Sequence, residues 1–144
     1  MIEKDTIRLL RECDAGVKMG IQSIDDVLDH VESPVLKARL DSCKQEHVKL
    51  GHEIRTQLTR FNDDGKDPGM IPSGMAWMKT NMMLAMKNSD HTIADLMTDG
   101  CGMGVKSLNK YLNQYEAADE RSKDISKRLI NLEEKLIVQM RDFL

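Results

Sequence analysis

The chain has 144 residues, a formal net charge of -3, 31% charged residues and only 3% aromatic residues. This length fits one domain with a buried core. The predicted helices carry no basic stripe, which argues against a nucleic-acid partner. No apolar run approaches the roughly 20 residues that span a membrane. The N-terminus lacks the pattern of a signal peptide, so we expect a cytoplasmic protein.

Sulfur-containing residues are frequent, with 11 methionines and three cysteines. The methionines and aliphatic residues must fill the core, because aromatic residues are so few. Cys13, Cys43 and Cys101 are widely spaced and odd in number, and they form no metal motif or disulfide framework. We expect them to be free thiols in the core.

One stretch of the chain occurs twice, beginning at Gly16 and again 84 residues later at Gly100. Each copy has glycines at its first and fifth positions, a methionine at the fourth and a serine at the eighth. A repeat at this distance predicts two similar halves, each opening with the same helix.

The first half reads as a pair of helices, over residues 5–31 and 34–61. Apolar residues recur every three or four positions in both segments. Ser33 and Pro34 separate them, since a serine caps a helix and proline suits its first position. The short loop requires the two helices to lie antiparallel.

The second half begins after a long connection, residues 62–89, which is dense in glycine, proline and aspartate at its start. A short helix over 74–87 is predicted inside it. Two more long helices follow, over 90–115 and 117–143. The break near Glu116 contains no glycine or proline, so a single helix over 90–143 is the alternative.

These elements predict an all-α fold in one domain, residues 1–144. Hairpins over 5–61 and 90–143 joined by a long crossover are the ferritin-like form of the four-helix bundle.

Several short motifs follow one another along the chain in a set order. They are Leu9-Leu10 with Gly16 and Gly20, Pro34-Val35-Leu36-Lys37, Ser73-Gly74-Met75-Ala76-Trp77-Met78-Lys79, and Asp99-Gly100 with Tyr111. In this order the chain resembles a family of ferritin-like bacterial domains of unknown function. The resemblance implies a fold and no activity, and Ile21 stands where that family has an aromatic residue.

The ligand pattern of a di-iron protein is missing. Such sites need Glu-x-x-His pairs on two helices. Three residues after Glu46 the chain has Lys49, and three residues after Glu53 it has Thr56, where a histidine would be required. The last helix has no histidine. The remaining metal candidates are His47, Asp14 and Glu53. Pairing of the first two helices places His47 beside Gly20, where it could instead bond to a backbone group or to a serine. The same pairing places Asp14 near Glu53, and we expect Asp14 at a solvated end of the bundle.

The segment over 74–87 carries the only tryptophan. Its apolar face includes Trp77, Met75, Met78 and Met82. Thioethers can bind Cu(I), but such a face more often packs against protein. We expect it to form part of a homodimer interface, because Met and Trp are enriched where protein surfaces meet.

The repeated glycines need a compensation, since glycine inside a helix costs about 1 kcal/mol relative to alanine. Gly16, Gly20, Gly100 and Gly104 either let the first and third long helices approach closely, which we favour, or leave room for a ligand.

The sequence therefore predicts a non-catalytic structural or protein-interaction bundle without a cofactor. Its expected partners are a second copy of the chain and an unidentified protein. The alternative is a ferritin-like protein that binds a metal or a small ligand.

Overall fold

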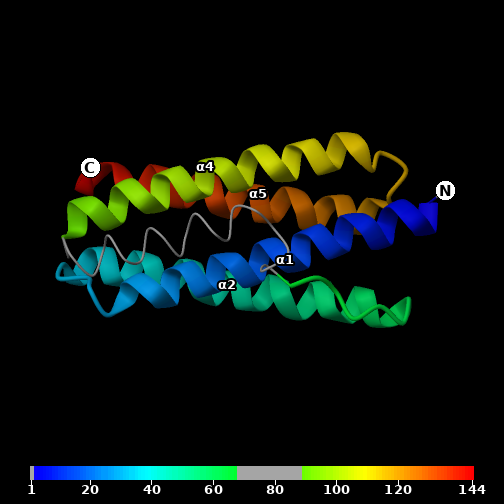
Figure 1. Ribbon diagram of the computed structural model, residues 1–144, viewed down its shortest axis with the longest axis horizontal. Helices are drawn as coiled ribbons and strands as arrows, with labels where there is room; N and C mark the ends of the chain where they lie inside the picture. The colour runs from blue at the N-terminus through cyan, green and yellow to red at the C-terminus, as the bar shows by residue number, and fades with distance from the viewer. Residues whose placement is uncertain (1, 68–88) are drawn as a thin grey trace.

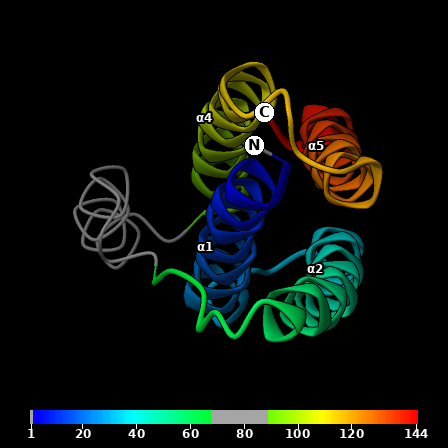
Figure 2. The same cartoon turned by 90° about the vertical axis from the view of Figure 1, so that its right-hand side faces the viewer.

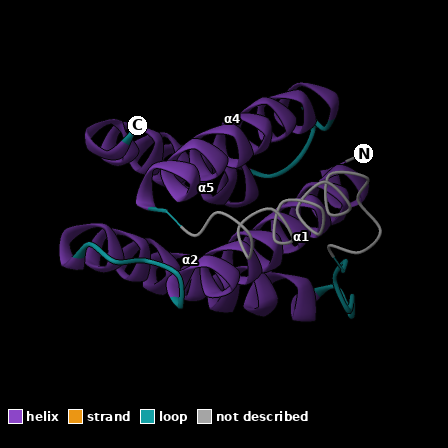
Figure 3. Ribbon diagram, turned by 60° about the vertical axis from the view of Figure 1, so that its left-hand side comes forward, coloured by secondary structure: helices purple, strands orange, loops and turns teal. Residues whose placement is uncertain are grey.

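The computed structural model describes residues 2–67 and 89–144. Four long helices pack as a bundle, and the described residues contain no strand (Figures 1 and 3). The elements are α1 (Ile2–Leu28), α2 (Pro34–Arg60), α4 (Asp90–Gln114), α5 (Glu120–Met140) and the short 3-10 helix η2 (Arg141–Phe143). The prediction of an all-α four-helix bundle is confirmed, and the single helix over 90–143 is excluded.

The helices form two antiparallel pairs, α1 with α2 and α4 with α5, which turn at opposite ends of the bundle (Figure 1). In the end-on view, α1 lies next to both α2 and α4, and α5 lies next to α2 and α4 (Figure 2). Helices α2 and α4 run in the same direction. The end of α2 and the start of α4 therefore lie at opposite ends of the bundle (Figure 1).

Side-chain caps start three of the helices. Ser33 accepts a hydrogen bond from the backbone N–H of Leu36, and Ser89 accepts one from Thr92. Both starts agree with the prediction. Asp119 caps α5 by accepting from the N–H of Ser122. Helix α5 therefore begins at Glu120, and the predicted start at 117 was wrong.

The turn of each hairpin is also held by residues at the start of the other hairpin. The Asp90 carboxylate accepts hydrogen bonds of 2.9 Å from the backbone N–H groups of Glu32 and Ser33. At the other end of the bundle, Asp5 and Thr6 accept from the N–H groups of Ala117 and Asp119, at 3.1 and 2.8 Å. These contacts hold both turns. Helix α1 spans Ile2–Leu28, so both predicted ends, at residues 5 and 31, were three residues too late.

The core consists of two apolar clusters along the bundle, and all three cysteines are free and buried within it. The expectation of free core thiols is confirmed. Burial raises the pKa of the Cys13 thiol to about 12. In α2, His47 lies between Cys43 of one cluster and Leu50 of the other. In α5, Glu133 lies between Leu129 and Leu136 in the same way.

The predicted short helix over 74–87, with Trp77, Met75, Met78 and Met82, lies outside the described residues. Its role as an interface stays a prediction. Among residues 2–67 and 89–144, no helix has the length and apolar character needed to cross a membrane.

Candidate functional site beneath a glycine-lined groove

His47 is the polar residue at the centre of the α2 face. Its side chain is buried, with 2% of its surface exposed, and it lies against Gly20 of α1, as predicted. A Cβ atom at position 20 would lie 2.6 Å from His47 Nε2. The glycine therefore makes room for the imidazole ring.

The two ring nitrogens of His47 have different surroundings. Nδ1 lies 2.8 Å from the backbone carbonyl oxygen of Cys43. A carbonyl oxygen can only accept, so Nδ1 carries the proton of this bond. On the other side of the ring, Nε2 lies 3.6 Å from Glu133 Oε1, which is too long for a hydrogen bond. Nε2 is buried and has no hydrogen-bond partner in the described part of the chain.

Glu133 enters the core from α5 and is 8% exposed. Gly104 of α4 makes room for it, because a Cβ atom at position 104 would overlap the carboxylate. Glu133 was not among the candidate site residues predicted from the sequence. The sequence repeat contained a signal that could have identified Glu133. Gly104 corresponds to Gly20, so the residue facing it should need the same extra room as His47.

The surroundings of His47 shift the pKa of its imidazole ring. Burial disfavours the imidazolium, but the Cys43 side chain and the Glu133 carboxylate outweigh this effect and raise the pKa of His47 to about 10. The raised pKa favours the imidazolium, in which Nε2 is a second N–H donor beside Glu133. Nε2 forms an ion pair of 3.6 Å with Glu133 Oε1 but no hydrogen bond with a described residue, so part of the hydrogen-bonding capacity of the pair is unused.

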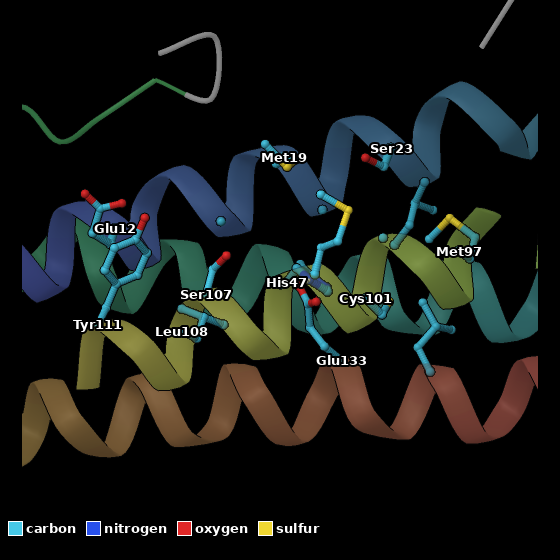
Figure 4. A pocket seen from close by; sticks show the side chains of 17 residues that line it. Glu12, Met19, Ser23, His47, Met97, Cys101, Ser107, Leu108, Tyr111 and Glu133 are labelled. Carbon is cyan, nitrogen blue, oxygen red and sulfur yellow. Dashed lines mark ion pairs between the residues drawn. The ribbon is translucent and has the colours of Figure 1, made fainter. Parts of the chain in front are cut away.

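A cavity of about 80 Å³ lies above this pair, between α1 and α4 (Figure 4). Figure 4 shows His47 and Glu133 directed toward each other near the middle of the cavity, with Ser23 and Met97 toward one end and Glu12 and Tyr111 at the other. This volume has room for several water-sized groups. The lining includes the four repeated glycines, Gly16, Gly20, Gly100 and Gly104.

Close packing of α1 on α4 through these glycines, which we favoured from the sequence, is not what the structure shows. The atoms nearest to a Cβ at Gly16, Gly20 or Gly104 belong to side chains of α2 and α5. They are Leu129, His47 and Glu133, in that order. The glycines instead open a groove, in line with the second interpretation.

A second carboxylate lies at one end of this groove. Glu12 Oε1 accepts a hydrogen bond of 2.6 Å from Lys66 Nζ, while Glu12 Oε2 is buried without a partner among the described residues. Tyr111 lines the same end, and burial together with the charge of Glu12 raises the pKa of its phenol. The groove is therefore apolar along its walls, with acidic groups at its floor and at this end.

The other two metal candidates do not join His47. Asp14 forms an ion pair of 2.8 Å with Lys18 and accepts from the N–H of Lys66 at 3.0 Å. It is only 4% exposed, so the expected solvated position was wrong. Its role is to hold the loop after α2, where Gly65 turns with a φ of 87°.

Glu53 lies on the surface and binds Arg128 of α5 through two hydrogen bonds. Within the described ranges, no group of three His, Cys, Asp or Glu side chains is arranged to hold a metal ion.

Comparisons with protein-family models, with curated proteins and with solved structures found no match for this chain.

Proposed function

We propose that this protein is a non-catalytic binding bundle whose groove between α1 and α4 takes a small organic ligand above His47 and Glu133. The observation that carries the proposal is that His47 Nε2, on the floor of the cavity, has no hydrogen-bond partner among the described residues. A buried donor without an acceptor costs about 1–3 kcal/mol. A ligand atom that accepts from Nε2 removes this cost, which gives the groove a specific binding contribution.

The chemistry of the lining supports binding over covalent catalysis. Cys101 is the one thiol in the lining, and burial raises its pKa well above the usual value. A protonated thiol is a poor nucleophile. The remaining lining is mostly glycine, methionine and aliphatic side chains, which suits an apolar ligand held by few polar contacts.

We also propose that the bundle is ferritin-like, with two related hairpins. The parallel run of α2 and α4 requires a long crossover, as that form has. The reciprocal contacts of Asp90 and of Asp5 and Thr6 with the turns support the same relation. Buried residues of α2 also recur in α5 at a constant distance of 86 positions. They include Leu36 with Ser122, Leu40 with Ser126, His47 with Glu133, and Ile54 with Met140.

The ferritin-like arrangement also supports the position of the proposed ligand site within the bundle. Ferritin-like carboxylate proteins hold their metals with inward side chains from facing helices. In this chain the equivalent inward positions of α2 and α5 hold one histidine and one glutamate, and α1 and α4 offer glycines. We infer that the space serves a ligand other than a metal pair.

The test is a screen of a diverse fragment library by ¹H–¹⁵N NMR, with a blocked groove as the reference. Ser107 is exposed and lines the groove, so Ser107→Phe should close its mouth without crowding the floor. Lys110→Phe is the matched control, because Lys110 is exposed on the same helix but does not line the groove.

We expect fragments that shift the amide signals of Gly16, Gly20, Gly100 and Gly104 in the parent and in Lys110→Phe, and not in Ser107→Phe. A library without any such fragment would overturn the proposal, as would hits that bind Ser107→Phe equally well.

A further inference from the structure

The floor of the groove offers one donor and one acceptor side by side. His47 Nδ1 already donates its proton to the Cys43 carbonyl, so Nε2 is a second donor in the imidazolium, which the raised pKa favours. The acceptor is Oε1 of Glu133, 3.6 Å away. The two atoms are too far apart to bond directly, but one oxygen atom about 2.8 Å from each would satisfy both. That atom must accept a hydrogen bond from His47 and donate one to Glu133.

Few ligand groups can do both with one atom. A hydroxyl group has one donor and two acceptor lone pairs. A carboxylate or an ether oxygen only accepts, and an ammonium group only donates. The geometry of the floor therefore selects for a hydroxyl.

The charges of His47 and Glu133 also disfavour a ligand whose head group is charged, whatever its sign. An anion would approach His47 but would also meet the adjacent carboxylate of Glu133. A cation bound to Glu133 would lie against the His47 imidazolium. Like charges in a site of low solvent access repel each other. A neutral head group meets neither penalty.

The walls suit a flat apolar body. The repeated glycines of α1 and α4 have no side chains to fill the groove from either side. Met19, Met97 and Met103 line the same space. Methionine side chains adapt to the shape of an apolar partner. The cavity, at about 80 Å³, is smaller than the 150 Å³ that enclose benzene in an engineered protein core. The ligand body must therefore extend toward the mouth, where Met103 is 47% exposed.

We propose that the groove binds uncharged ligands with an apolar, flat body and a hydroxyl group that bridges His47 Nε2 and the Glu133 carboxylate. This inference rests on the proposed function, namely that the groove binds a small ligand. It adds the chemical class of the ligand and the roles of the two floor residues as donor to and acceptor from its hydroxyl.

The test uses four probes of similar size on the full chain: phenol, anisole, toluene and benzoate. Anisole keeps the oxygen of phenol but cannot donate, toluene has no oxygen, and benzoate is an anion. Titration is followed by the NMR signals of the groove glycines and of the His47 ring. We expect phenol to bind about tenfold more tightly than anisole or toluene, and benzoate to bind more weakly than phenol.

Glu133→Gln is the matched variant, since it keeps the shape of Glu133 and removes its charge. We expect the preference for phenol over anisole to fall several-fold in this variant, while toluene affinity stays within twofold. Far-ultraviolet circular dichroism checks that the variant is folded. If it is not, the order of the four probes on the parent protein decides alone.

Equal affinities of phenol, anisole and toluene at the groove would overturn the hydroxyl inference while leaving the proposed binding function intact. Tighter binding of benzoate would overturn it too. Failure of every probe, together with a fragment screen that finds no groove ligand, would overturn both proposals.

Discussion

At the scale of single residues, the centre of this protein is organised by two glycines and the polar side chains that they admit. Gly20 lies against His47, and Gly104 lies against Glu133. Each glycine weakens its own helix by about 1 kcal/mol relative to alanine. The protein retains them because a larger residue would displace the buried pair.

Gly20→Ala should therefore destabilise the protein by about 1–3 kcal/mol, since its Cβ would lie 2.6 Å from the His47 ring. Gly102→Ala is the matched control. Gly102 is exposed on α4 with no atom within 4 Å of an added Cβ, so alanine should stabilise by up to about 1 kcal/mol. Urea unfolding measures both changes.

The double variant Gly20→Ala with His47→Ala tests whether Gly20→Ala destabilises the protein by crowding the His47 ring. We expect it to be less destabilised than the sum of its two single variants, because the crowded ring is gone. Additive effects would show that Gly20 is retained for another reason.

The charge of His47 makes a prediction about pH. Its pKa is raised in the folded state, to about 10, above about 6.5 in the unfolded chain. The stabilisation from charging is complete below pH 6.5 and is lost as the pH rises toward 10, at most about 1.4 kcal/mol per pH unit. Among the described residues, Cys43 and Glu133 are the titratable groups that act on this ring, and Cys101 in turn is affected by both of them.

The measurement compares the free energy of unfolding of the parent and of His47→Gln between pH 6 and pH 10. The difference between the two proteins should shrink as the pH rises. An NMR titration of the His47 ring checks the assignment directly, and a midpoint near 6.5 would contradict it.

At the scale of the elements, the ends of the helices depend on contacts across the bundle. The serine caps at Ser33 and Ser89 act locally, and their positions were predictable from the residues themselves. The contacts of Asp90, Asp5 and Thr6 join residues far apart in sequence, and no local pattern predicts them.

Asp90→Ala should cost about 2 kcal/mol of stability, because it removes the acceptor of two hydrogen bonds that the backbone N–H groups of Glu32 and Ser33 donate. Asp95→Ala, an exposed acidic position on the same helix, is the control and should change stability by less than about 0.5 kcal/mol. Thermal unfolding measures both variants. Equal effects would mean that the turn is held by other contacts.

At the scale of the whole molecule, the sequence predicts self-association through the segment over 74–87. This segment lies outside the described residues, so its apolar composition is the basis of the prediction. Trp77→Ser with Met78→Ser should weaken self-association and leave helix content largely unchanged. Sedimentation and circular dichroism test this pair of expectations. A parent protein that is monomeric at high micromolar concentration would contradict the homodimer.

The sequence by itself determined the all-α class, the four long helices and the pairing of His47 with Gly20. These features follow from local rules, because helical periodicity, serine caps and a short loop act between residues that are close in sequence. The repeat also distinguished Gly16, Gly20, Gly100 and Gly104 from the other glycines, since the same spacing recurs 84 residues apart.

Only the tertiary structure decided what those glycines are for. Glu133 reaches His47 from a helix that begins more than 70 residues later, and no local pattern encodes that meeting. The burial of Asp14 depends in the same way on Lys66, which the loop after α2 brings back to α1. Apolar periodicity tells which face of a helix is buried. Which polar groups meet inside depends on the axial positions of the packed helices, and these are fixed by contacts between residues distant in sequence.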